Sequence, residues 1–207
     1  SMRYLCPQSS ALTTEPSDRP IVPSTPAEDV LLVLWPFEDN RAFLPLLPAG
    51  RVIAAREGAQ ERGDLEQESR LLYFTLRTLP PSVAPANIEA RWQEGIRLVG
   101  YAVQPRGARQ LLVTLYWRLD KEIAKSYTVF CHITRAGQRI GQHDGPPAGG
   151  YYPTDLWRPR DTVADTHTVD LSEDCAPGAC RLVVGLYAWE TMERLPLLDA
   201  EGRASPE

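Results

Sequence analysis

The densest group of side chains able to bind a ligand lies between residues 142 and 157. It combines amide, carboxylate and aromatic groups, and several prolines interrupt it. Prolines restrict the backbone, so such a loop loses less entropy when it presents its side chains. Aromatic rings can cover the apolar face of a sugar, while carboxylates and amides bond to its hydroxyl groups. The pattern predicts a carbohydrate-binding loop with these ligand-binding residues: Gln142, Asp144, Tyr151, Tyr152, Asp155 and Trp157.

An architectural role is favoured for part of this set. Asp144 can hold its own turn through backbone hydrogen bonds, and Trp157 can close the end of a β-sandwich as a core residue. Trp157 precedes an Arg-Pro pair at the start of an expected strand, whereas Tyr151 and Tyr152 follow two glycines. We therefore expect Trp157 to be buried and Tyr152 to be exposed.

The three histidines lack the neighbours of a catalytic group. The chain has no Gly-x-Ser-x-Gly nucleophile motif and no glycine-rich phosphate loop. Asp165 and His167 share one face of an expected strand and could supply two metal ligands, but a metal site needs more. His143 falls on an expected turn, and His132 lies on a strand. We expect surface or partly buried histidines, with no catalytic residue, no metal and no cofactor.

The cysteines indicate one short disulfide. Cys175 and Cys180 flank Ala-Pro-Gly-Ala, a turn sequence short enough to bring the two sulfurs together. We predict that they are bonded, which would imply an oxidising compartment. Cys131 lies in an alternating apolar run and is expected to be a buried free thiol. A zinc site would need two further good ligands beside the Cys175–Cys180 pair, and the neighbouring carboxylates are poor substitutes.

Alternation of apolar and polar side chains predicts a series of short strands in the C-terminal part of the chain. Turn signals rich in glycine and proline separate these segments. Short antiparallel strands at such spacing are typical of a sandwich or jelly roll. We predict a mainly β protein, an antiparallel and jelly-roll-like β-sandwich, with strands at 96–103, 111–119, 127–133, 162–171 and 181–189.

The N-terminal part of the chain has a different character. Residues 1–26 are rich in Ser, Thr and Pro and predict a disordered tail or linker. Residues 27–85 predict a small α/β segment, with apolar strand-like runs and a short helix. Asp39 or Asn40 could cap that helix, and Pro45 and Pro48 would curtail it. The expected domain organisation is a tail at 1–26, an α/β segment at 27–85 and a β-sandwich at 86–207.

Charge and hydropathy exclude two classes of partner. The net charge of the 207-residue chain is -5, and no block of Lys or Arg occurs. Nucleic acids and anionic membrane surfaces are therefore not expected partners. The longest apolar run, Val30 to Trp35, is far shorter than the roughly 20 residues of a membrane-spanning helix. We expect no transmembrane segment.

The last 120 or so residues resemble a known module. The resemblance rests on ANIEARWQEGIRLVGYAV, a Gln-x-Asp-x-x-Pro turn, a Tyr-Pro-Thr-x-x-Trp loop and the run RLVVGLYAWETMERLPL. Together they resemble the soluble C-terminal β-sandwich region of bacterial membrane glycosyltransferases similar to dolichyl-phosphate-mannose protein mannosyltransferases. Arg160 departs from the glycine usual in that family, and Cys175 and Cys180 replace a plain Pro-Gly turn. The resemblance implies an extracytoplasmic location but no transferase activity, because the chain carries none of the family's transmembrane catalytic portion.

Three functions fit these observations. The first is a non-catalytic extracytoplasmic accessory module, associated with glycan or cell-envelope glycosylation, that binds a carbohydrate or a membrane-protein partner. The second is a polysaccharide hydrolase or lyase that uses loop carboxylates around Asp144 and Asp155. The third is a structural interaction domain whose residues 28–80 pack against a membrane partner. An exposed aromatic strip would favour the first, two carboxylates facing a deep cleft the second, and a broad apolar patch the third.

Overall fold

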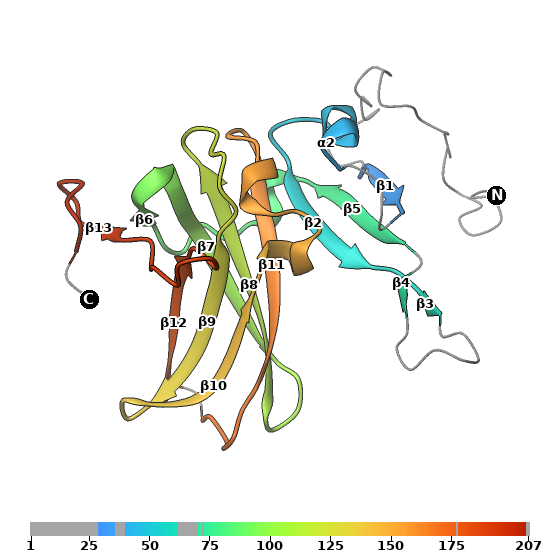
Figure 1. Cartoon of the computed structure of the whole chain (residues 1–207). Coiled ribbons are helices and arrows are strands. Elements are labelled where there is room, and N and C mark those ends of the chain that lie inside the picture. Colours follow the sequence, from blue (N-terminus) through green and yellow to red (C-terminus); the bar gives the residue numbers. More distant parts are fainter. Residues whose placement is uncertain (1–28, 36–39, 62–69, 72, 177, 206–207) are drawn as a thin grey trace.

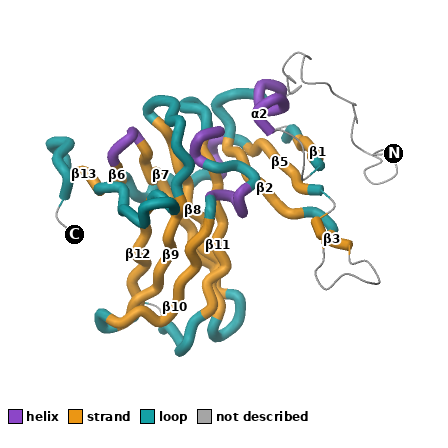
Figure 2. Tube along the Cα trace, viewed as in Figure 1, coloured by secondary structure: helices purple, strands orange, loops and turns teal. Residues whose placement is uncertain are grey.

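The protein is mainly β (Figures 1 and 2). The computed structural model describes residues 29–35, 40–61, 70–71, 73–176 and 178–205. These ranges contain thirteen strands, one α-helix of four residues and five short 3-10 helices. The tail predicted at 1–26 lies outside the described residues.

Two sheets form the body of the molecule. The larger has eight strands in the order β1-β5-β2-β11-β8-β7-β6-β13, and the smaller has three in the order β10-β9-β12. A separate two-stranded ribbon joins β3 and β4. The large sheet contains β1 (Leu31–Leu34), β5 (Phe74–Leu79), β2 (Val52–Glu57), β11 (Thr162–Asp170), β8 (Gln110–Leu119), β7 (Ile96–Pro105), β6 (Ala90–Trp92) and β13 (Leu197–Leu198). The other strands are β10 (Gln138–Gly145), β9 (Thr128–Arg135), β12 (Cys180–Tyr187), β3 (Gln60–Glu61) and β4 (Arg70–Leu71).

The small sheet lies over one half of the large sheet, and the core fills the space between them (Figure 1). Side chains alternate between the two faces of a strand, so every second residue of β8 and β9 points inward. The inward residues are almost completely buried: Val113, Leu115 and Trp117 on β8, and Val129, Cys131 and Ile133 on β9. The predicted β-sandwich is therefore confirmed at the level of two packed sheets.

Strands β1, β5 and β2 extend the large sheet beyond the sandwich and are called the wing here (Figure 1). β2 pairs in parallel with β11, from Val52 opposite Thr162 to Ala54 opposite Ala164. The N-terminal strands thus belong to the same sheet as the sandwich. Among the described residues of this part of the chain, the helical turns are α2 (Asn40–Phe43), η1 (Leu44–Leu46), which carries a proline in its first turn, and η2 (Pro81–Val83) before the sandwich.

The wing has one covered and one open face. Leu32 and Leu34 of β1 are buried in the same apolar cluster as Leu44 and Leu47 of the helical turn. On the other face Leu31, Val33 and Trp35 are exposed by 48%, 37% and 64%. No helix in the described ranges is long and apolar enough to cross a bilayer.

The sequence did not predict strand β10. It pairs with β9 from Gln138 opposite Arg135 to Gly145 opposite Val129, with a bulge between Arg139 and Gly141. As an edge strand it carries polar side chains on much of its length, so it lacks the apolar alternation that marks the other strands. His143 therefore lies on a strand and not on the turn expected for it.

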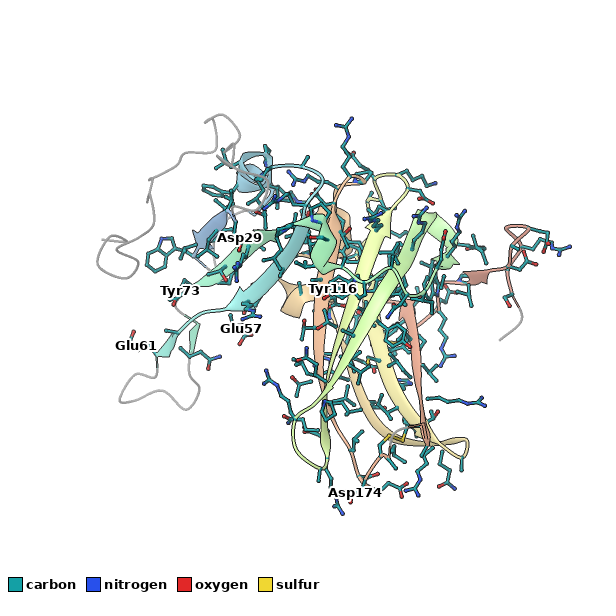
Figure 3. All side chains as sticks on the ribbon, turned by 180° about the vertical axis from the view of Figure 1, so that it is seen from behind. Asp29, Glu57, Glu61, Tyr73, Tyr116 and Asp174 are labelled. Carbon is teal, nitrogen blue, oxygen red and sulfur yellow. A yellow bond between two sulfur atoms is a disulfide. The ribbon has the colours of Figure 1, made fainter. Side chains whose placement is uncertain are left out.

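Short turns and 3-10 helices complete the fold. These helices are η2 (Pro81–Val83), η3 (Gln93–Gly95), η4 (Pro147–Gly150) and η5 (Thr154–Leu156). The turn between β11 and β12 is closed by a disulfide joining Cys175 and Cys180. In Figure 3 this bond lies at the end of the sandwich marked by Asp174.

Candidate functional site

The proline-rich loop places its two largest rings in the core. Trp157 is 3% exposed, as expected from the sequence, and its indole stacks on Trp117 at a centroid distance of 6.4 Å. Tyr152 is 0% exposed, so the expectation of an exposed ring was wrong. Two glycines before Tyr152 do not lead to a projecting tip, because η4 folds back toward β2 and β11. Burial raises the pKa of the Tyr152 hydroxyl, and the negative charge of Asp161 adds to this. A ligand cannot reach the Tyr152 ring.

Two other residues of this loop are engaged with the N-terminal part of the chain. Tyr151 stacks on Phe74 of the wing at 4.6 Å and donates its hydroxyl hydrogen to Glu57 at 3.3 Å. Asp155 accepts a hydrogen bond from the Ser126 hydroxyl at 2.7 Å and forms an ion pair with Arg41. Tyr151 thus joins the wing to the sandwich, Asp155 joins α2 to it, and both residues are only partly accessible.

Gln142 and Asp144 lie elsewhere, on the outer face of the small sheet. Asp144 contacts the imidazole of His132 on the neighbouring strand, with 3.0 Å between Oδ1 and Nε2. Gln142 is directly opposite His132 in the strand register and is exposed. The structure therefore separates the predicted ligand-binding residues into a buried or bridging group from the loop and an outward-facing pair on β10.

Aromatic side chains that the sequence analysis did not select lie on the same outer face. The ring of Phe130 lies over Gly185, where any Cβ would come within 2.4 Å of the ring. The guanidinium of Arg194 lies 5.0 Å from the centre of this ring, a cation–π distance. Tyr187 contacts Trp189 at a centroid distance of 6.4 Å, and Trp189 is 67% exposed.

These residues form one group, which we call the outer-face cluster. His132 bridges its polar and aromatic parts, because its ring lies 5.0 Å from Phe130 while Nε2 contacts Asp144. Asp144 also raises the pKa of the Tyr187 hydroxyl through its charge, in addition to the larger effect of burial. The outer-face cluster consists of Phe130, His132, Gln142, Asp144, Tyr187, Trp189 and Arg194.

A second polar group lies between the two sheets, on β11 of the large sheet and β10 of the small sheet. Asp165 and His167 of β11 are both 1% exposed and point into the core. The Asp165 carboxylate accepts hydrogen bonds from the Ala148 amide at 2.8 Å and the Trp117 indole at 3.3 Å. Its Oδ2 atom lies 2.8 Å from His167 Nε2. The Nδ1 atoms of His167 and His143 are also 2.8 Å apart, so the chain of contacts runs from the core to the partly exposed β10.

The contacts between Asp165, His167 and His143 are not arranged as a hydrolytic or metal site. Cys131 is the residue opposite His143 in the strand register, but it is completely buried. Burial, followed by the charges of Asp165 and Asp144, raises the pKa of the Cys131 thiol to about 12, whereas a nucleophilic cysteine needs a lowered pKa. Within the described residues no group of three or more His, Cys, Asp or Glu side chains could hold a metal ion.

The sequence contained part of the signal for both groups. Asp165 and His167 were recognised as neighbours on one strand face, but their partner His143 comes from a strand without an apolar pattern. Phe130 and Tyr187 occur in ordinary strand positions and Trp189 lies in the turn after β12, so only the pairing of β9 with β12 brings them together. Comparison of the chain with protein-family models, curated proteins and solved structures finds no match.

Proposed function

We propose that the protein is a non-catalytic accessory module that binds a glycan on the outer-face cluster. The proposal includes the jelly-roll-like arrangement, the extracytoplasmic location and the association with cell-envelope glycosylation predicted from the sequence. The resemblance to the C-terminal region of membrane glycosyltransferases supports the last two points.

The observation that carries the proposal is the combination of an exposed indole with hydrogen-bonding groups in the outer-face cluster. Trp189, in the turn after β12, offers an accessible ring beside Tyr187, and Gln142 and Asp144 of β10 offer amide and carboxylate groups. A sugar needs both kinds of contact, one for its C–H face and one for its hydroxyl groups. Phe130, flat on Gly185 and covered by Arg194, supports this face from below.

The hydrolase or lyase alternative is less well supported by the geometry. Asp144 contacts His132 on the small sheet, while Asp155 pairs with Arg41 and Ser126 beside the wing. Acid–base cleavage of a glycosidic bond needs two carboxyl groups flanking one substrate. Asp144 and Asp155, the two carboxylates proposed for that role, instead bind separate partners in different parts of the molecule.

A second candidate function is docking of a partner protein on the open face of the wing. It is favoured by the three exposed apolar side chains there, Leu31, Val33 and Trp35. Exposed apolar side chains grouped on one strand are typical of interaction surfaces. This candidate corresponds to the interaction domain that the sequence left as an alternative.

A binding experiment with paired tryptophan variants separates the two candidates. Wild-type protein is screened against an array of neutral and acidic bacterial envelope polysaccharides, and each hit is titrated by calorimetry. Trp189→Ala should weaken binding by about tenfold, because removing a stacked ring costs roughly 1.4 kcal/mol. Asp144→Asn should also weaken it.

The matched control is Trp35→Ala, because Trp35 is exposed to nearly the same extent on the wing. It should leave glycan affinity unchanged. A screen in which no polysaccharide binds contradicts the proposal. Binding that is lost in Trp35→Ala and retained in Trp189→Ala also contradicts it and favours the wing.

A further inference from the structure

All three histidines of the 207-residue chain lie on the adjoining strands β9, β10 and β11. His132 faces outward with Asp144, whereas His143 and His167 contact each other on the inner side. β10 is the edge strand of the small sheet and β11 belongs to the large sheet. The His143–His167 contact therefore joins the two layers at the side of the sandwich.

The hydrogen bonds around Asp165 determine which ring nitrogens of His167 and His143 carry protons. Ala148 and Trp117 can only donate, and an ionised carboxylate can only accept, so His167 must carry a proton on Nε2. A neutral His167 then has a lone pair on Nδ1. His143 must donate its Nδ1 proton to that lone pair at 2.8 Å, which leaves Nε2 of His143 unprotonated.

We propose that the His143–His167 contact is a proton-controlled latch between β10 and β11. The contact is closed while both rings are neutral. A proton added to His143 Nε2 weakens it, because the charged ring is then held in a partly buried position, although its Nδ1–H still donates to His167. If both rings are charged, two N–H groups and two positive charges face each other, and the bond is lost.

The two ends of β10 are held differently, which determines what the latch releases. At one end the backbone amide of Ser172 donates to the Ile140 carbonyl at 2.8 Å, and Gly141 forms a bridge to Leu171. These backbone contacts do not titrate. At the other end the layers are joined through His143 and through the Ala148 amide bound to Asp165. Opening should therefore be confined to residues 143–150.

Electrostatics around His143 agree with an acid-induced opening. Burial is the largest effect on the pKa of His143 and lowers it; His167 lowers it further, and Asp165 and Asp144 partly oppose both. Cys131, which faces His143 from β9, stays neutral because its pKa is raised to about 12. His132 lies on the opposite face and contacts Asp144.

The direction of the pH effect follows from this lowered pKa. The closed state binds the proton less well than the open state, whose histidine has its usual pKa of about 6.5. Closure is therefore fully stable above about pH 6.5 and weakens as the pH falls below that value. At low pH the ratio of open to closed protein rises by about tenfold for each unit by which closure lowers the pKa of His143.

Hydrogen exchange tests the latch in the full chain without any ligand. Backbone amides of residues 143–150 are followed at about pH 7.5 and about pH 5, with rates corrected for intrinsic exchange. In wild-type protein their protection should fall several-fold at the lower pH, while β8 keeps its protection. His143→Gln removes the titrating partner at the accessible side of the contact and should abolish this difference.

The matched control is His132→Gln, which removes a histidine from the neighbouring strand but leaves the inner contact intact. It should retain the wild-type pH response. Equal protection of residues 143–150 at both pH values in wild-type protein overturns the proposal. A response that persists in His143→Gln, or disappears in His132→Gln, also overturns it. None of these outcomes depends on glycan binding.

Discussion

Trp157 donates its indole N–H to the carbonyl oxygen of Tyr152 at 2.8 Å, and both rings are buried. The bond folds the loop back on itself and directs the two aromatic side chains into the same core. Trp157 continues a series of indoles, since Trp117 contacts both Trp157 and Trp92. The loop therefore closes one part of the sandwich and does not present a platform to solvent.

Replacing either ring with alanine should destabilise the protein severely. We expect Tyr152→Ala and Trp157→Ala each to reduce the free energy of unfolding by about 3 to 5 kcal/mol, through lost burial and an unfilled cavity. Trp189→Ala should change it by less than about 0.5 kcal/mol, because most of that side chain is already exposed. Urea unfolding of the three variants makes the comparison. A Tyr152→Ala protein as stable as wild type would contradict the observed packing.

The Arg158–Asp161 ion pair should be important for attaching the helical turn to the sandwich. Asp161 is 1% exposed and accepts a hydrogen bond from the Gly50 amide at 2.7 Å, while Arg158 donates to the carbonyls of Leu44 and Leu47. Asp161→Asn should cost about 2 to 3 kcal/mol. This is less than the roughly 3 to 5 kcal/mol of a fully buried pair, because a quarter of Arg158 is exposed.

The control for this variant is Glu89→Gln, which removes one partner of the exposed Arg91–Glu89 pair. It should leave the denaturation midpoint unchanged, since exposed ion pairs are screened by solvent. If both variants melt at the wild-type temperature, the Arg158–Asp161 pair does not stabilise the junction.

Cys131 should be unreactive in the folded protein. Its pKa of about 12 keeps the thiol protonated at neutral pH, and its side chain is 0% exposed. In a Cys6→Ser background, a disulfide reagent at about pH 8 should modify no thiol in the native protein and one after unfolding in guanidinium chloride. Rapid modification of the native protein would show that the space between the sheets opens readily.

The Cys175–Cys180 disulfide should contribute only modestly to stability. It closes a very short segment, with a sequence separation of 5, so it removes little entropy from the unfolded chain. Reduction, or replacement of both cysteines by serine, should cost about 2 kcal/mol and leave the protein folded. Peptide mapping without reductant should recover the two cysteines in one linked peptide. Recovery of two free thiols would contradict the pairing.

The strands of the sandwich could be predicted because their information is local. In β8 and β9 every second side chain is apolar, and this alternation by itself distinguishes the core face from the other face. The short helical turn is local in the same way, because Pro45 lies at its start and limits its length. The burial of Trp157 followed from its position next to an expected strand.

The outer-face cluster and the contacts between Asp165, His167 and His143 depend on residues that are distant in sequence. His143 and Asp144 are neighbours in the chain, yet strand alternation sends one inward to His167 and the other outward to His132. Nothing local distinguishes these directions, because β10 has no apolar pattern. Tyr152 likewise was expected to be exposed from its neighbours, and only the return of η4 onto β2 and β11 leads to its burial. The tertiary structure decides such positions because the free energy of burying a ring or a carboxylate depends on partners that arrive from other strands.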